Sequence, residues 1–262
     1  MPTTYTHDLF GKAVFQKLPE EIRKIIHRNK TEYLIGLHGP DILFYYRPFH
    51  RNEVNQTGHR MHEEIAADFF RHCKREYLAS GDEGILSYML GFICHYMLDS
   101  GCHPYIYSYT ERTGASHAEI ETELDRAFME KNGKNPFRYR PASVIHPDKK
   151  AEKTIAAVFE GISEKQIHRT LRGMKFYTGI LVCRMPWKRK FILRFLRLLG
   201  VYEETHGRVM RKQHFNKCEE STGELMRMVK CAVPETVTVL EEFYATLDEP
   251  ETVNYRFSRN YK

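Results

Sequence analysis

The sequence predicts an all-α fold built as a multi-helix bundle, and three observations support this prediction. Apolar residues recur with helical spacing through most of the chain, and the alternation typical of β-strands is weak everywhere. Proline and glycine residues fall mostly between the apolar-periodic blocks. With 42% apolar and 13% aromatic residues, a chain of 262 residues can fill a sizeable core. We therefore expect a single all-α domain over residues 1–262.

The first half of the chain is expected to form six helices. Pro19 stops the first helix, and Gly39-Pro40 breaks the third before the segment DILFYY continues as a helical turn. Pro104 is expected to end the fifth helix, and Ser116 is expected to cap the sixth. The six helices are expected at residues 6–17, 20–29, 31–38, 58–79, 83–100 and 116–131. A loop is expected at residues 47–56, after the third helix.

Residues 132–147 form the one clear long loop of the sequence. All candidate metal ligands lie before this loop, within residues 1–131, and a ligand-poor helical half, 148–262, follows it. Helices in this second half are expected near residues 148–160, 163–184, 187–199, 203–231 and 234–247. The tail from Asp248 is expected to be extended.

Composition argues against several classes of protein. No run of eighteen apolar residues occurs, so we expect no transmembrane segment. The N-terminal stretch has no basic region followed by an apolar one, so we expect no signal peptide. The six cysteines lack the spacing of a disulfide framework, which predicts reduced thiols in a cytoplasmic protein. The net charge of +6 favours anionic partners such as phosphate esters or lipid headgroups.

The stretch 90–125 carries the chemistry on which the functional interpretation depends. Its polar residues of interest are His95, Asp99, His103, His117 and Glu121. His95 and Asp99 are four residues apart and share one face of a helix, and His117 and Glu121 repeat this spacing. Because the first pair sits in an apolar run, it is expected to be buried, where such groups need a partner or a metal. Imidazole and carboxylate are zinc ligands, so we favour a metal site over two satisfied polar pairs.

Three further candidate ligands lie upstream, and each has an ordinary structural alternative. His7 is one turn into the first helix, where position alone would favour a surface histidine. Asp41 follows the Gly-Pro break, which can aim it into a cleft or leave it as a helix cap. His62 can face inward, either as a ligand or as a core histidine.

Several segments resemble one known family. They are THDLFG, GLHGPDILFYY, MHEEIAADFF, GFICHYMLDSGCHPYI and SHAEIETELDR, which together cover about residues 1–130. They resemble the bacterial zinc-dependent phospholipase C family, which is distantly related to zinc-dependent single-strand nucleases. The resemblance implies the all-α fold of that family and a cluster of up to three zinc ions.

The resemblance also implies how the ligands divide. Asp41, His62, His95 and Asp99 would hold one zinc ion, and His103, His117 and Glu121 a second. Asp99 would bridge to a third, also bound by His7 and the N-terminal residue. This chain begins Met-Pro where secreted relatives expose tryptophan, so we expect removal of Met1 to leave Pro2 as that ligand. Asp125, four residues beyond Glu121, would orient a ligand or remain a surface carboxylate.

The implied activity is that of a zinc-dependent phosphodiesterase of phospholipase C type, in which a metal-activated hydroxide attacks a phosphodiester. Asp41 would be the catalytic base or would orient the water. A phospholipid substrate is favoured. Ile42 stands where choline-specific relatives have an aromatic residue, which argues against specificity for choline headgroups.

Two alternative functions stay open. The first is a nuclease or another phosphohydrolase with the same zinc site, although nothing resembles a base-reading motif and +6 is a modest charge for a nucleic-acid protein. The second is a non-catalytic, zinc-stabilised helical protein that contacts membranes peripherally. Residues 187–199, with Trp187 and a basic face, can form such a contact or pack as a surface helix of the bundle.

Overall fold

The computed structural model describes residues 4–262, apart from the side chain of Glu204. It confirms the all-α prediction, since the described residues form helices, turns and loops and no strand. The α-helices are α1 (Thr4–Phe15), α2 (Glu20–Arg28), α3 (Lys30–Gly36), α4 (Glu53–Glu63), α5 (Ala66–Ser80), α6 (Glu83–Thr113), α7 (His117–Lys131), α8 (Lys149–Val158), α9 (Glu164–Leu181), α10 (Pro186–Leu198), α11 (Tyr202–Thr205) and α12 (Glu219–Ala245). Short 3₁₀ helices are η1 (Gly39–Tyr45), η2 (Pro141–Val144), η3 (His206–Arg208), η4 (Asn216–Cys218) and η5 (Tyr255–Ser258).

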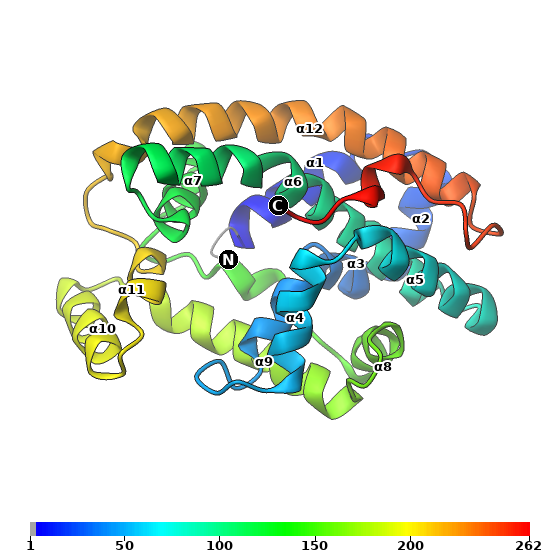
Figure 1. The fold of residues 1–262 in the computed structure, drawn as a ribbon, viewed down its shortest axis with the longest axis horizontal. Helices are drawn as coiled ribbons and strands as arrows, with labels where there is room; N and C mark the ends of the chain where they lie inside the picture. The colour runs from blue at the N-terminus through cyan, green and yellow to red at the C-terminus, as the bar shows by residue number, and fades with distance from the viewer. Residues whose placement is uncertain (1–3) are drawn as a thin grey trace.

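Helix α6 is the centre of the molecule, with α1, α3, α5 and α12 packed around it. It is buried over most of its length because its sequence is apolar on all sides. Its closest neighbour is α3, which approaches it through Gly36 and Gly91. A Cβ atom at Gly91 would lie 2.3 Å from the carbonyl oxygen of Tyr33, so only glycine permits this approach. Figure 1 shows α12 along one edge of the molecule, with α8, α9 and α10 towards the opposite edge.

The expectation that Pro104 ends this helix is wrong, because α6 continues through Pro104 to Thr113. Proline at this position has no N–H to donate to the carbonyl oxygen of Ser100, one turn earlier. Arg259 takes over this role, and its Nη2 donates to the Ser100 oxygen at 2.8 Å. The helix therefore stays continuous and carries His103 on the same face as the two earlier candidate ligands.

The helix expected over 58–79 is two helices. Helix α4 begins at Glu53, inside the expected loop, because Asn52 and Asn55 form a reciprocal capping box. The chain then becomes extended at Glu64 and Ile65 before α5 begins. This break turns the chain directly after His62.

The C-terminal boundaries also differ from the expectation. Residues 206–218 contain two 3₁₀ turns instead of a helix, and α12 continues through Pro234. The tail is not simply extended, since it includes η5 and buries Phe257 and Tyr261. The remaining helices lie within a few residues of their expected ranges, and the prediction of a single domain over 1–262 stays a prediction.

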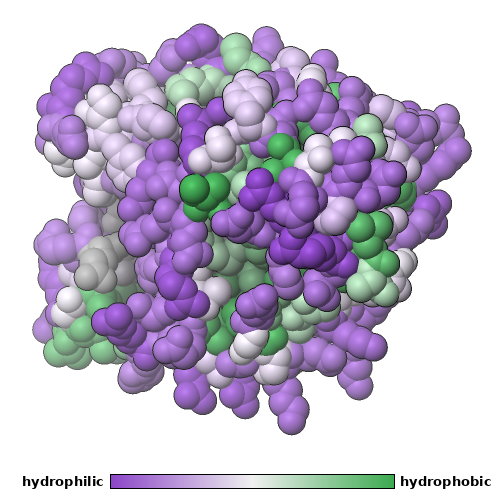
Figure 2. Space-filling view, turned by 45° about the vertical axis from the view of Figure 1, so that its right-hand side comes forward, coloured by the Kyte–Doolittle hydropathy of each residue, from purple (hydrophilic) through white to green (hydrophobic). Residues whose placement is uncertain are grey.

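Some apolar side chains lie outside the main core, either in a second buried cluster or on the surface. Residues Cys183, Ile192, Leu196 and Val209 form a small separate core beneath α10. The face in Figure 2 is mainly hydrophilic, with small hydrophobic patches between charged side chains. Within residues 4–262, no helix is both long enough and apolar enough to cross a bilayer.

Candidate metal centre

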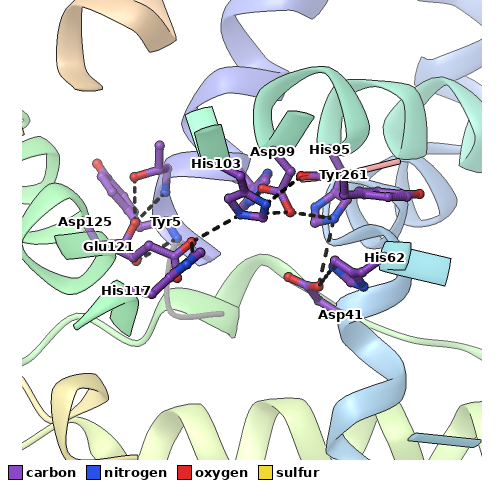
Figure 3. A network of polar contacts seen from close by, with 12 residues as sticks. Tyr5, Asp41, His62, His95, Asp99, His103, His117, Glu121, Asp125 and Tyr261 are labelled. Atoms are coloured by element: carbon purple, nitrogen blue, oxygen red, sulfur yellow. Dashed lines mark hydrogen bonds and ion pairs between the residues drawn. The ribbon is translucent and has the colours of Figure 1, made fainter. Parts of the chain in front are cut away.

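The structure brings together the eight candidate ligands from residue 7 to residue 121, and five elements contribute them. Figure 3 shows most of these side chains converging below α6. Helix α6 supplies three of them at intervals of four residues, and η1, α4, α1 and α7 cover the face on which these three buried side chains lie. The ligands by element are His95, Asp99 and His103 (α6), His7 (α1), Asp41 (η1), His62 (α4), and His117 and Glu121 (α7).

The first group consists of Asp41, His62, His95 and Asp99, each of which offers a ligand atom within 4.8 Å of the others. His62 Nε2 lies 3.1 Å from Asp41 Oδ1. His95 Nε2 lies 3.3 Å from Asp99 Oδ2 and 3.9 Å from Asp41 Oδ1. Two imidazoles and two carboxylates at this spacing match the donor types of a zinc site.

The second group consists of His103, His117 and Glu121. Glu121 Oε1 lies 3.0 Å from His117 Nε2 and 3.8 Å from His103 Nε2. Three protein ligands leave a coordination position open, which is the arrangement of catalytic rather than structural zinc sites.

Asp99 lies between the two groups. Its Oδ2 is 3.7 Å from His103 Nε2, and its Oδ1 is 3.1 Å from His7 Nε2. The His7 ring stacks on that of His95 with 4.5 Å between centroids. The geometry at Asp99 and His7 is therefore compatible with a third ion, whereas the predicted ligand Pro2 lies outside the described residues.

Backbone hydrogen bonds fix the orientation of two of the histidines. The Nδ1 atom of His62 lies 2.7 Å from the carbonyl oxygen of Gly58, and that of His103 lies 2.8 Å from the carbonyl oxygen of Tyr261. When Nδ1–H donates to a carbonyl, the lone pair of Nε2 points the other way, here towards the carboxylates. Metal-binding histidines commonly have such a partner.

Buried polar atoms test whether this site fits a metal. Side-chain atoms that lie close together but form no hydrogen bond of acceptable geometry gather at the centre of the site within the described part of the chain, namely His62 Nε2, His95 Nε2, His103 Nε2, Asp41 Oδ1, Asp99 Oδ2 and Glu121 Oε2. Buried groups of this kind are normally satisfied, and a cation would satisfy all of them together. The residues present therefore fit zinc.

The charge states of Asp99 and His95 also favour a metal, whereas, against the effect of burial, nearby carboxylates raise the pKa of His7, His62 and His103, whose protons a bound metal would displace. Burial opposes ionisation of Asp99, but the imidazoles of His95, His103 and His7 hold the pKa of this carboxyl well below its usual range. Burial, only partly offset by Asp99 and Asp41, lowers the pKa of His95 to about 4. An anionic carboxylate beside a neutral imidazole is the state in which both side chains bind metal.

Asp125 has a different neighbour from the one expected. Its carboxylate accepts hydrogen bonds from the backbone N–H of Tyr5 at 3.2 Å and of Thr6 at 2.9 Å, and from the Thr6 hydroxyl at 2.6 Å. These N–H groups open α1, so Asp125 satisfies the start of the helix that carries His7. Among the described residues, no hydrogen bond joins Asp125 to His117 or His95, so the expected role of orienting either histidine has no contact to support it.

Sequence reasoning assigned no role to several residues next to the site. His38 is buried, and burial together with the nearby His7 and His95 lowers its pKa to about 3. Tyr261 is buried, with its ring 4.9 Å from that of His62 and 5.9 Å from that of His95. The sequence signals for these two residues were the apolar residues around His38 and the alternation of apolar residues in the tail that contains Tyr261.

Arg208, on η3, is a further such residue. A Cβ atom on the preceding Gly207 would lie 2.9 Å from the backbone nitrogen of Glu119, so η3 packs directly on the first turn of α7. The Nε atom of Arg208 is buried without a hydrogen-bond partner among the described atoms. Burial raises the pKa of the Tyr45 phenol to about 12. The positive charge of Arg208 lowers this pKa, and the negative charges of Asp41 and Glu121 raise it. Arg208 thus lies next to the first turn of α7, which begins with His117.

An all-helical chain with two adjoining groups of histidine and carboxylate side chains is a candidate zinc enzyme. Residues 6–173 match the family model described as "Zinc dependent phospholipase C", which is more than half of the chain. The protein therefore belongs to the zinc-dependent phospholipase C family, as the sequence motifs indicated, and the match extends beyond the residues 1–130 that carry those motifs. Searches of curated proteins and of solved structures found no match. The family is one of zinc-dependent hydrolases.

Proposed function

We propose that the protein is a zinc-dependent phosphodiesterase that cleaves phospholipids as phospholipases C do. The observation that supports this most strongly is the pair of adjoining ligand groups joined by Asp99. Buried carboxylates and imidazoles with unpartnered atoms facing one another are costly unless they bind cations. A protein that needed zinc only for stability would require one closed site of four ligands.

The proposed ligands are those of the two groups, with His7 and Pro2 completing a third site beside Asp99. When bound, zinc ions supply positive charge to a phosphodiester and activate water for attack on phosphorus. The protein fixes these ions by holding its histidines through Gly58 and Tyr261. It also keeps the carboxylates ionised at neutral pH.

We propose Asp41 as the catalytic base or water-orienting carboxylate. Burial opposes its ionisation, yet the imidazoles of His95 and His62 keep its pKa below the usual value. Asp41 stands on a short 3₁₀ segment after the left-handed Gly39, whereas the other carboxylates of the site stand on long helices. A carboxylate in this position can accept a proton from water or hold its orientation.

Arg208 is the residue that we propose to bind the phosphate of the substrate. A guanidinium donates paired hydrogen bonds to phosphate oxygens and adds charge where negative charge develops. The packing of Gly207 on α7 holds the backbone of Arg208 beside the second ligand group. Its buried, unpartnered Nε is a donor ready for such an acceptor.

Metal content measured by plasma mass spectrometry, on protein purified without chelator, tests the proposal. We expect more than one zinc ion per chain in the wild type and the loss of at least one in Asp99→Ala, together with loss of phospholipid hydrolysis. Asp248→Ala, which removes an exposed carboxylate, is the matched control and should keep both.

Other outcomes discriminate among the alternatives. A single zinc ion that survives Asp99→Ala would indicate a structural site and reject the proposal. Zinc loading with hydrolysis of single-stranded nucleic acid and not of phospholipid would identify the nuclease alternative. Protein free of zinc would leave the clustered histidines without a catalytic role.

A further inference from the structure

Positive charge is concentrated in one part of the chain. Of its 40 lysine and arginine residues, ten lie in residues 165–202, which contain none of the 34 aspartate and glutamate residues. The rest of the chain therefore holds 30 basic and 34 acidic residues and is net negative, although the whole protein carries +6. These 38 residues comprise most of α9 and all of α10.

The cations of α10 lack carboxylate partners. Lys190, Arg194 and Arg197 are exposed, and no ion pair to them occurs among the side chains that the structure describes. By contrast, many exposed basic residues elsewhere are paired, for example Arg112 with Glu220 and Arg227 with Glu224. The α10 charges are thus available to an anionic partner.

Exposed apolar side chains lie next to these cations on the same helix. Trp187, Phe191, Phe195 and Leu198 are 67%, 64%, 47% and 82% exposed. At 3.6 residues per turn, their spacing of four, four and three residues places them in one stripe, with the three cations along its edge. We call these seven residues the outer face of α10. Helices of soluble proteins rarely leave such a stripe uncovered.

The outer face is additional to the side of α10 that packs inward. Ile192 and Leu196 are buried with Cys183 and Val209 in the small core beneath the helix. Packing as a surface helix, one of the two alternatives for residues 187–199, accounts for this inner side but leaves a second apolar side unexplained. Helix α10 also lies beyond residue 173, where the family match ends, so the shared family region does not explain it.

We propose that the outer face of α10 docks on the surface of a membrane containing anionic phospholipids. Aromatic and leucine side chains would enter the boundary between headgroups and acyl chains, and the three cations would lie at the level of the phosphates. A second copy of the chain does not suit this face, because two such helices would oppose like charges. This proposal rests on the proposed function, since a membrane holds the phospholipid that the site would cleave.

Helix α9 links the outer face of α10 to the metal centre. Gly173 of α9 packs so closely on η1 that a Cβ atom would lie 2.5 Å from the carbonyl oxygen of Tyr45. A hollow of about 640 Å³ opens between these elements, and its lining includes Arg47, Arg169 and Arg172. Cations therefore continue from α10 towards the segment that carries Asp41.

Trp187 is the only tryptophan of the chain, so its fluorescence reports directly on the outer face. The zinc-loaded protein is mixed with vesicles of phosphatidylcholine alone, or of phosphatidylcholine with phosphatidylglycerol. We expect a blue shift and co-sedimentation only with the anionic vesicles, and suppression of both by high salt.

Two variants test the two chemical components. Lys190→Glu, Arg194→Glu and Arg197→Glu together should weaken vesicle binding at least about tenfold. Phe191→Ser with Leu198→Ser should weaken it while leaving the charge unchanged. The charge-matched control reverses exposed lysines on other elements, Lys131→Glu, Lys134→Glu and Lys149→Glu, and should bind like the wild type.

Hydrolysis of a short-chain, non-vesicular phospholipid separates this proposal from the function proposed for the site. The outer-face variants should keep that activity and lose activity on anionic vesicles. Absence of vesicle binding by the wild type would overturn the docking proposal even if the enzyme is active. So would binding to single-stranded nucleic acid in place of vesicles, or self-association through α10.

Discussion

The guanidinium of Arg208 would give the site a positive charge that no candidate metal ligand supplies. We expect Arg208→Ala to lower kcat/KM for phospholipid by about 10²–10³, because one lost donor to a developing negative charge commonly costs this much. Zinc content should be unchanged. Arg208→Lys should recover part of the activity, since lysine keeps the charge but not the paired donors.

The matched control for Arg208 is Arg227→Ala. Arg227 is exposed on α12 and pairs with Glu224 of the same helix, so its loss should leave kcat/KM near the wild-type value. Loss of zinc from Arg208→Ala would contradict the proposed role, because it would show that the residue supports the ligands and not the substrate.

At the scale of single residues, the sequence predicts ligands well where their spacing is local. His95, Asp99 and His103 lie at intervals of one helical turn, and a helix alone aligns them. His38, Tyr261 and Arg208 escape such reasoning because their positions depend on how distant segments fold back on α6. Nothing local in the sequence specifies that a tail residue bonds to His103.

At the scale of elements, Pro104 shows why a local rule failed. Proline removes one hydrogen bond from a helix, and this normally ends or kinks it. Here Arg259, 159 residues away from Ser100 in sequence, donates to the carbonyl that the proline leaves free. The rule concerns an isolated helix, whereas the missing donor comes from another part of the fold.

This substitution of one donor by another can be measured by a double-mutant cycle. Arg259→Met should lower the free energy of unfolding by about 1.5–3 kcal/mol, the range for a hydrogen bond to a charged group. In a Pro104→Ala background the cost should be clearly smaller, because the N–H of alanine can then bond to Ser100. Denaturant unfolding at one fixed zinc concentration is the measurement, since bound metal adds to stability.

Arg256→Met provides the control for this cycle. Arg256 belongs to the same segment but pairs with Glu235 of α12 at 2.8 Å, so its cost should not depend on residue 104. Equal costs of Arg259→Met in the two backgrounds would show that Arg259 does not replace the missing helix donor.

At the scale of the whole molecule, the division into a ligand-rich and a ligand-poor half describes the ligands but not the site. The half after residue 147 holds His103 through Tyr261 and contributes Arg208 beside the second group. It also carries the excess of positive charge. Ligand motifs could be found in the sequence, but these contributions depend on chain reversal and on packing between residues far apart.

The last residues provide the sharpest test of this dependence. Tyr261 closes one side of the site with its ring, while its carbonyl oxygen orients His103 and its N–H donates to the carbonyl of His62 at 3.4 Å. Deleting residues 260–262 removes all three contacts. We expect zinc affinity to fall about 10–100-fold, the usual effect of losing the partner of a metal-binding histidine.

Two substitutions separate the contacts. Lys262→Ala removes an exposed pair with Glu63, keeps the amide carbonyl of Tyr261, and should leave the affinity within about twofold. Tyr261→Ala keeps the backbone oxygen that His103 uses, so it should reduce zinc affinity less than the deletion does. Wild-type affinity in the deletion of 260–262 would mean that His103 is oriented without the tail. The zinc ligands would then be held in place without the C-terminal residues.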